Sequence, residues 1–240
     1  ANIRANPGRT VAENKPPLVL SATFFKDPLY AGGPSAPQQL PTFLGNHDMG
    51  RFATFVRKAN PDADEAEQLA RVKLGHSMLI LLRGVPTIYS GDEQGFVGDG
   101  NDQDAREPLF PSRVAVYNDN RLIGTTATTA QANFDTAHPL YRHIAALAKV
   151  RQSDPALRAG EQRVLEAATE GPGLFAVARR LPQGNRAPFL DTIVMFNTSA
   201  QPLKANVMID PRIDVTRSLW GNCPLPSAPG TLTVELEPFA

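Results

Sequence analysis

The chain has little of three things that often define a protein class: cysteine, an excess of one charge, and long apolar runs. Its single cysteine, Cys223, excludes an internal disulfide framework and a zinc site built from cysteines. Basic and acidic residues number 24 each, so no strongly basic surface points to nucleic acid or an acidic membrane. The longest apolar run, Met78–Leu82, is far shorter than the roughly 18 residues of a membrane span. We therefore expect neither nucleic acid nor a membrane as partner.

Glycine and proline are abundant instead. The 240 residues include 18 glycines and 22 prolines, and only 20% of the chain is charged. This composition is typical of an enzyme with long connections rather than of a helical bundle. The length is enough for one large domain or two modest ones.

Residues 40–154 alternate between short apolar runs and amphipathic stretches. The first run, Leu40–Gly45, fits a buried strand that ends in polar residues. Asp62 and Glu65 together form a capping box, which predicts a helix that starts there and ends before Gly84. An earlier apolar island at residues 18–25 is too short to assign to a helix or a strand, and residues 27–34 are typical of a loop.

A second apolar run, Val85–Tyr89, predicts another strand. A long polar loop follows to about Asp135, and His138–Pro139 then opens a helix that ends at Asp154. Because apolar strands here alternate with helices, we expect the strands to pair in parallel and to be covered on both faces.

The pattern changes after about Glu161. Short alternating runs predict strands at Arg163–Ala168, Leu174–Arg180, Thr192–Asn197, Ala205–Ile209 and Thr231–Leu236, with turn clusters at residues 171–173 and 182–185. Such runs are typical of a small antiparallel β-sandwich. The fold class is therefore α/β followed by all-β, with a boundary between residues 1–160 and 161–240.

Polar clusters follow both predicted parallel strands. The first is Asn46-His47-Asp48 and the second is Ser90-Gly91-Asp92-Glu93. Parallel α/β proteins bind ligands at the carboxyl ends of their strands, so these clusters are the candidate site. The competing interpretation is a strand end tied down by local side-chain hydrogen bonds, and for the first cluster the two interpretations are about equal.

Two families use a Gly-Asn-His-Asp segment. In metallophosphoesterases it supplies metal ligands, but those enzymes also need an upstream Asp-x-His and a later Gly-His-x-His. No Asp-x-His precedes Gly45, and the segment at His76 lacks a second histidine and lies on an amphipathic helix. The four histidines cannot complete that metal geometry, so this interpretation is distant.

The second match extends over most of residues 18–240. Leu40–Arg51 resembles the last catalytic segment of the α-amylase family of glycoside hydrolases. Further segments are similar to that family in the same order: Gly84–Phe96 to its eighth strand, Arg106–Phe110 to the following loop, His138–Arg151 to the final barrel helix, and residues 161–240 to its C-terminal sandwich. The chain thus resembles the C-terminal portion of a (β/α)8 TIM barrel followed by an antiparallel β-sandwich.

The resemblance implies roles for the residues of the first cluster. Asp48 matches the family's third catalytic carboxylate, which binds sugar hydroxyls and favours the oxocarbenium-like transition state. His47 matches the histidine that hydrogen-bonds the same sugar. Asn46 and Arg51 are expected either to bind substrate themselves or to support the residues that bind it.

Three further residues receive supporting roles. Tyr89 and Glu93 match the barrel rim, where we expect packing and anchoring of loops. Arg106 is expected to hold the long loop by pairing with an acid rather than to contact substrate. The other histidines, His76, His138 and His143, are interpreted as helix residues without chemistry.

A retaining glycosidase also needs a nucleophile and a general acid. In the α-amylase family both precede the segment that opens at Leu40, and the only acids before it, Glu13 and Asp27, match neither motif. We therefore expect a chain that is incomplete and inactive alone, the C-terminal part of an α-glucan hydrolase or transglycosylase. The missing N-terminal barrel portion is its expected partner, and an α-glucan or oligosaccharide its expected substrate.

No cofactor or metal is expected in this chain. Residues 99–104 are acidic but break the EF-hand pattern, and the resemblance leaves calcium open for the parent protein. The resemblance also allows the parent protein to be secreted or periplasmic. The competing function is a non-catalytic module that binds glucan or stabilises a partner. In that case Trp220 is the candidate sugar contact, although core packing is favoured for both Trp220 and Phe196.

Overall fold

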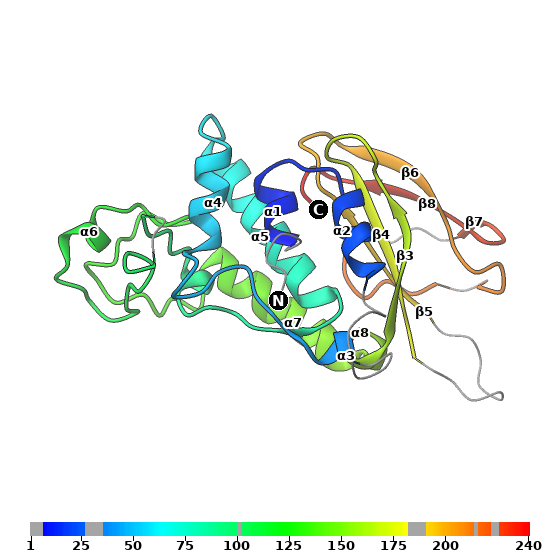
Figure 1. The fold of residues 1–240 in the computed structure, drawn as a ribbon, viewed down its shortest axis with the longest axis horizontal. Helices are drawn as coiled ribbons and strands as arrows, with labels where there is room; N and C mark the ends of the chain where they lie inside the picture. Colours follow the sequence, from blue (N-terminus) through cyan, green and yellow to red (C-terminus); the bar gives the residue numbers. More distant parts are fainter. Residues whose placement is uncertain (1–6, 27–35, 100–101, 182–190, 214–215, 222–225) are drawn as a thin grey trace. The chain divides into compact units, whose positions relative to one another are not determined.

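The structure is a computed structural model that describes residues 7–26, 36–99, 102–181, 191–213, 216–221 and 226–240 (Figure 1). Its chain forms two compact units, each discontinuous in sequence. The first combines Ala1–Glu13, Pro41–Ile80 and Pro86–Ala146, and the second combines Asn14–Leu40, Leu81–Val85 and Leu147–Ala240. The predicted boundary at residue 160 stays a prediction. Three features of the sequence analysis, the loop at 27–34, the turn at 182–185 and Cys223, lie outside the described residues.

The first unit contains helices that the sequence analysis did not identify. Helix α1 spans Pro7–Ala12 and helix α4 spans Phe52–Ala59. The side chains of Phe52 and Val56 are buried, and the amide of Asn60 donates a 2.8 Å hydrogen bond to the Ala12 carbonyl. These helices are shorter than the length at which a helix is stable alone, so their stability comes from packing.

The long helix α5 spans Glu65–Leu81, close to the predicted range, but its cap differs from the expected one. The Asp64 carboxylate, not that of Asp62, accepts the backbone N–H of Glu67 at 2.8 Å. The N-cap of this helix therefore lies two residues later than expected. Both Asp-x-x-Glu frames fit the sequence rule, and the backbone selects the second.

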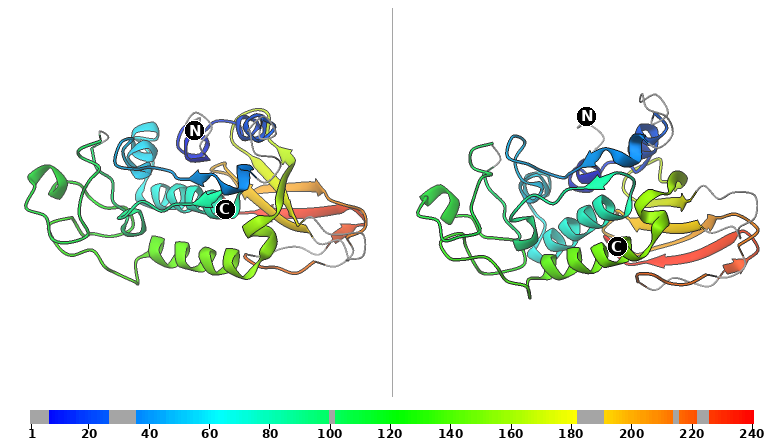
Figure 2. Two further views of the ribbon diagram at one scale, coloured as in Figure 1. Left: turned by 60° about the horizontal axis from the view of Figure 1, so that its bottom comes forward. Right: turned by 90° about the horizontal axis from the view of Figure 1, so that it is seen from below.

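Helix α7 spans Pro139–Ser153, as the sequence predicted. The His138 ring accepts the backbone N–H of Leu140 through Nδ1 at 3.2 Å, so this side chain closes the first turn. Helices α5 and α7 run side by side (Figures 1 and 2), and Ser77 Oγ lies 2.8 Å from Nε2 of His143 across them. The long connection between them includes the short helices η3 (Asp92–Gln94) and α6 (Ala115–Asn118).

Strands β1 (Pro41–Thr42) and β2 (Val85–Pro86) pair with each other, and both are shorter than expected. The Val85 N–H donates to the Leu40 carbonyl at 2.9 Å, and the Thr87 N–H donates to that of Thr42 at 2.7 Å. The residue offset is the same in both bonds, which is the pattern of a parallel pair. The predicted parallel pairing is therefore confirmed.

The second unit holds two antiparallel sheets. One has the order β3-β4-β5, with β3 at Glu161–Ala167, β4 at Leu174–Arg180 and β5 at Asp191–Asn197. The other has the order β6-β8-β7, with β6 at Leu203–Met208, β7 at Pro226–Ala228 and β8 at Thr231–Leu236. The five strand positions expected from alternation are thus confirmed within a few residues, and β7 was not anticipated.

Both sheets contribute to one hydrophobic core. Its buried members come from β4, from the end of β6 and from β8: Leu174, Ala176, Val207, Ile209, Leu232 and Val234. Helix α2 (Leu18–Phe24) packs on the same unit, with the Phe24 ring 6.2 Å from that of Phe175. Helix α3 (Ala36–Gln39) and helix α8 (Pro155–Ala159) complete this unit, and Asp154 caps α8 through the N–H groups of its first turn.

No helix in the described part of the chain has the length and apolar character needed to cross a membrane.

Candidate active site

A five-residue turn follows β1 and carries the residues of the first polar cluster. Asn46 and Gly50 exchange backbone hydrogen bonds of 3.2 and 3.1 Å, and Asn46 Oδ1 accepts the N–H groups of Asp48 and Met49 at 2.9 and 2.8 Å. Gly50 has a φ of 91°, and a Cβ on Gly45 would lie 2.5 Å from the Gly50 carbonyl oxygen. Asn46 therefore shapes the turn by the local side-chain bonds that the alternative interpretation expected.

The turn presents His47 and Asp48 to solvent. Their side chains are 61% and 70% exposed, and His47 Nε2 lies 3.3 Å from Asp48 Oδ1. An imidazole and a carboxylate at this spacing can share a hydroxyl group of one ligand, since the carboxylate accepts and the ring can donate. This pair is the part of the cluster that is free to meet a substrate.

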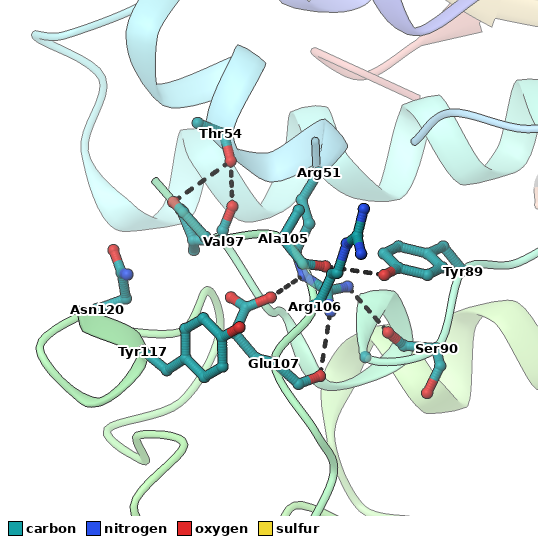
Figure 3. Close-up of polar contacts among 12 residues, drawn as sticks. Arg51, Thr54, Tyr89, Ser90, Val97, Ala105, Arg106, Glu107, Tyr117 and Asn120 are labelled. Carbon is teal, nitrogen blue, oxygen red and sulfur yellow. Dashed lines mark hydrogen bonds and ion pairs between the residues drawn. The ribbon is translucent and has the colours of Figure 1, made fainter. Parts of the chain in front are cut away.

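Arg106 reaches the same turn from the long connection. Its Nε donates to the His47 carbonyl at 3.4 Å and to the Asp102 carbonyl at 3.2 Å, and its Nη2 lies 3.5 Å from the Asp102 carboxylate. The expected pairing with an acid is therefore present. Arg106 links the backbone of the turn to the loop that follows β2, and Figure 3 shows it beside Tyr89.

Arg51, directly after the turn, is buried to 1% exposure. Its Nε donates to Glu107 Oε2 at 2.5 Å and its Nη1 donates to the Ser90 carbonyl at 2.9 Å (Figure 3). The same Nη1 lies 3.4 Å from Asp92 Oδ1. Because its donors are directed at the protein interior, we interpret Arg51 as the supporting residue that the sequence analysis gave as one alternative. Substrate contact by Arg51 stays an untested prediction.

Two aromatic rings complete the surroundings of Arg51. The guanidinium carbon lies 4.6 Å from the centre of the Tyr89 ring and 5.0 Å from that of Phe96. The Tyr89 hydroxyl donates to the Ala105 carbonyl at 2.9 Å. Burial raises the pKa of Tyr89, and the positive charge of Arg51 opposes that rise. Tyr89 thus lies in a packing position, as expected for a rim residue.

Glu93 anchors the backbone after β2. Its Oε2 accepts the N–H of Gly91 at 2.9 Å, and Gly91 has a φ of 98°. A Cβ at Gly91 would lie 2.5 Å from the Phe96 ring and 3.1 Å from Nη1 of Arg51. A side chain here would collide with the Phe96 ring and crowd the Arg51 guanidinium, so glycine at position 91 keeps both groups in place, and Glu93 holds its backbone.

Three further buried polar residues lie at this site: Glu107, which was not singled out from the sequence, Asp92 of the second polar cluster, and His76, which was interpreted as a helix residue without chemistry. Glu107 and Asp92 are the acids that face Arg51, and His76 Nε2 lies 3.7 Å from Asp92 Oδ2. The His76 Nδ1 is 2.8 Å from the Val72 carbonyl. Glu107 lies in the segment Arg106–Phe110, which carried part of the family resemblance. Its position next to Arg106 was the only feature of the sequence that pointed to a role in the site.

Among the described residues, no three His, Cys, Asp or Glu side chains gather in a group that could hold a metal ion.

The fold and the turn together define a class: an α/β chain with its polar turn at the carboxyl end of paired parallel strands, followed by antiparallel sheets. The family model for the α-amylase catalytic domain matches residues 34–160, and the chain belongs to the α-amylase family. An α-amylase from Streptomyces lividans is 47% identical over 160 residues, which cover 67% of this chain and 17% of that protein. A cyclomaltodextrin glucanotransferase from a Bacillus species is 34% identical over 119 residues, or 50% of this chain and 12% of that protein.

Solved structures agree on the fold. An Anoxybacillus α-amylase has a TM-score of 0.71 at 20% identity, over 99% of this chain and 44% of that one. The chain therefore spans less than half of the length of each of these proteins.

Proposed function

We propose that this chain is the C-terminal part of a retaining glycoside hydrolase that acts on α-glucosidic bonds in starch, glycogen or maltooligosaccharides. The observation that carries the proposal is the turn at residues 46–50, which exposes His47 and Asp48 side by side within the region matched by the family. The names of the α-amylase and glucanotransferase relatives support α-glucan as the substrate class.

In the proposed reaction, Asp48 accepts hydrogen bonds from sugar hydroxyls at the cleavage subsite. Its negative charge favours the oxocarbenium-like transition state, in which the sugar ring gains positive charge. His47 donates to the same sugar. Asn46 holds the turn in shape, while Arg51 and Arg106 hold it against the segments that follow β2.

The finer architecture belongs to the same proposal. Strands β1 and β2 are the last two strands of a (β/α)8 barrel whose C-terminal part is residues 1–160, and residues 161–240 form a β-sandwich. Two antiparallel sheets that share one core support the second part of this proposal. The nucleophile and the general acid then lie in an N-terminal barrel portion, which is the proposed partner.

The test compares the 240-residue chain with the longer protein that carries it, using maltoheptaose as substrate. We expect the chain alone to release no shorter sugar, and we expect Asp48→Asn to lower kcat of the longer protein by at least about 10²-fold. Asp62→Asn is the matched control and should keep the activity. Hydrolysis by the chain alone that is lost on Asp48→Asn would contradict the proposal.

A second candidate is glucan binding by the antiparallel unit. Trp220 is 45% exposed, so the favoured expectation of core packing was wrong, whereas Phe196 is 2% exposed and lies in the core as expected. An exposed indole can stack on a sugar ring. A glucan pull-down with Trp220→Ala tests this candidate, and unchanged retention counts against it.

A further inference from the structure

One buried guanidinium faces two buried carboxylates beside the candidate active site. The side chains of Arg51, Asp92 and Glu107 are 1%, 5% and 0% exposed. Glu107 takes most of the guanidinium, because Nε donates to its Oε2 at 2.5 Å and Nη2 donates to its carbonyl oxygen at 3.5 Å. With both acids ionised, the three side chains have one negative charge in excess, and an uncompensated buried charge is strongly unfavourable.

Asp92 is the acid that Arg51 satisfies less well. Its Oδ1 lies 3.4 Å from Nη1, and the same Nη1 also donates to the Ser90 carbonyl at 2.9 Å. This long contact is the one hydrogen bond that the Asp92 carboxylate accepts within the described part of the chain. The excess negative charge therefore lies mainly at Asp92.

His76 of α5 faces this carboxylate with one of its ring nitrogens. The ring is 1% exposed, Nε2 lies 3.7 Å from Asp92 Oδ2, and Nδ1 lies 2.8 Å from the Val72 carbonyl oxygen. A carbonyl only accepts hydrogen bonds, so Nδ1 carries a proton. In a neutral ring, Nε2 would then direct a lone pair at a carboxylate, and no described residue donates a hydrogen bond to it. A proton on Nε2 removes this repulsion and supplies the missing positive charge.

The other groups around His76 do not supply that charge. A small space beside His76 and Asp92 is otherwise lined by residues that carry no charge: Phe52, Ala53, Val72, Gly95 and Phe96. The nearby basic side chains are Lys73 on α5 and His143 on α7. Burial, together with the charge of Lys73, lowers the pKa of His143 to about 4, so that ring is neutral at pH 7.5 and does not repel a charged His76.

We propose that His76 is a positioning residue of the candidate active site and carries a proton on both ring nitrogens. As an imidazolium it balances Asp92, and Arg51 then keeps its bonds to Glu107 and Ser90. Arg51 directly follows the turn that presents Asp48, so the charge of His76 fixes this turn through Asp92 and Arg51. The charge assignment rests on the buried cluster alone, whereas an effect on catalysis also rests on the proposed function.

The charge is tested by nitrogen-15 NMR of the histidine rings in the 240-residue chain at pH 7.5. The His76 ring is identified by its contact with the Phe52 ring, at 6.2 Å between centroids, and we expect both of its nitrogens to be protonated. Asp92→Asn removes the excess acid and should leave one proton, on Nδ1. Glu93→Gln changes the adjacent acid, which accepts the Gly91 N–H, and as the matched control it should keep both protons. A single proton on His76 in the unsubstituted chain would overturn the proposal.

The positioning role is tested in the same chain by the backbone amide signals of Asp48 and Met49. His76→Gln should shift both signals, and the double variant His76→Gln/Asp92→Asn should bring them back, because it removes the acid that has lost its counter-charge. A merely structural role of the ring predicts that the second substitution adds to the first. Amide signals that do not move in His76→Gln, or that move further in the double variant, would refute the positioning role.

The consequence for catalysis is measured as kcat of maltoheptaose cleavage by the longer protein. His76→Gln should lower kcat at least about tenfold, and the double variant should recover most of the loss. An unchanged kcat in His76→Gln would contradict the link to catalysis. A longer protein that does not cleave maltoheptaose contradicts the proposed function instead, while the NMR results still decide the charge and position of His76.

Discussion

The guanidinium of Arg51 and the carboxylate of Glu107 form a buried ion pair, with 2.5 Å between Nε and Oε2 and side-chain exposures of 1% and 0%. Arg51 directly follows the turn that carries Asp48, and Glu107 directly follows the arginine that contacts the carbonyl of His47. The pair thus joins the two segments that flank the candidate active site. Because the pair is buried, its loss would lower the stability of the unit as well as change the positions of these two segments.

Replacing Arg51 with alanine should strongly destabilise the first unit. Loss of the guanidinium leaves the buried Glu107 and Asp92 carboxylates without their counter-charge, and breaking a buried pair in this way costs about 3–5 kcal/mol. The matched control is Arg121→Ala, which removes an exposed pair with Glu65 and should cost less than about 1 kcal/mol. Urea unfolding followed by circular dichroism measures both, and equal losses would contradict the assignment.

Asn46→Ala should loosen the turn while leaving the rest of the chain folded. The substitution removes the oxygen that accepts the N–H groups of Asp48 and Met49, and a lost bond of this kind costs about 1 kcal/mol. Asn46→Asp keeps an accepting oxygen and should stay within about 0.5 kcal/mol of the unsubstituted chain. Thermal unfolding of the two variants distinguishes the bond from the mere change of side chain. An Asp variant as unstable as the Ala variant would refute the acceptor role.

Stability should fall as the pH falls below neutral, because His143 is neutral in the folded state. Burial lowers the pKa of His143 from its usual 6.5 to about 4. Between about pH 6.5 and about pH 4, the His143 ring is therefore protonated in the unfolded chain but neutral in the folded chain. Protonation thus favours the unfolded chain, so the free energy of unfolding decreases as the pH falls through this range. The full effect is at most about 3 kcal/mol.

The matching variant is His143→Gln, which removes the titrating ring. Urea unfolding at pH 7.5 and at pH 5.0 should show a smaller difference in this variant than in the unsubstituted chain. An unchanged difference would show that other groups cause the pH dependence.

Asp64→Ala should shorten or destabilise helix α5, whereas Asp62→Ala should not. The Asp64 carboxylate accepts the N–H of Glu67, and removal of an N-cap acceptor costs about 1 kcal/mol. Asp62 occupies the equivalent place in the earlier frame that the sequence also allows. A larger loss of helical circular dichroism or of melting temperature in the Asp62 variant would restore the frame predicted from the sequence.

The antiparallel strands were predictable because their residues alternate between inside and outside. In β8, for example, Leu232 and Val234 lie two residues apart and both enter the core, whereas the residues on either side of each are less buried. Helices α1, α4 and α8 were not predictable to the same degree, since helices this short depend on what packs against them. A strand with alternating residues can therefore be predicted from its own sequence, whereas a short helix also depends on segments that are distant in sequence.

The candidate site shows the same division. Asn46, His47 and Asp48 are adjacent, so the sequence alone placed them in one cluster after a strand. The burial of Arg51 depends on Glu107, which is 56 positions away, and on Gly91, whose missing side chain makes room for the guanidinium. No local pattern reports such a contact, and for that reason substrate binding and support could not be told apart for Arg51.

The turn at residues 46–50 also has a consequence for the order of folding. The bonds between its own residues join positions at most four apart, and such short closures are fast. The contact between Arg51 and Glu107 closes a loop more than ten times longer and carries a larger entropic barrier. We infer that the turn forms early in folding and that the contact between Arg51 and Glu107 forms late. In φ-value analysis, Asn46→Ala should therefore slow refolding, whereas Arg51→Ala should mainly speed unfolding. A nascent chain could therefore carry a formed turn before the ion pair that secures it exists.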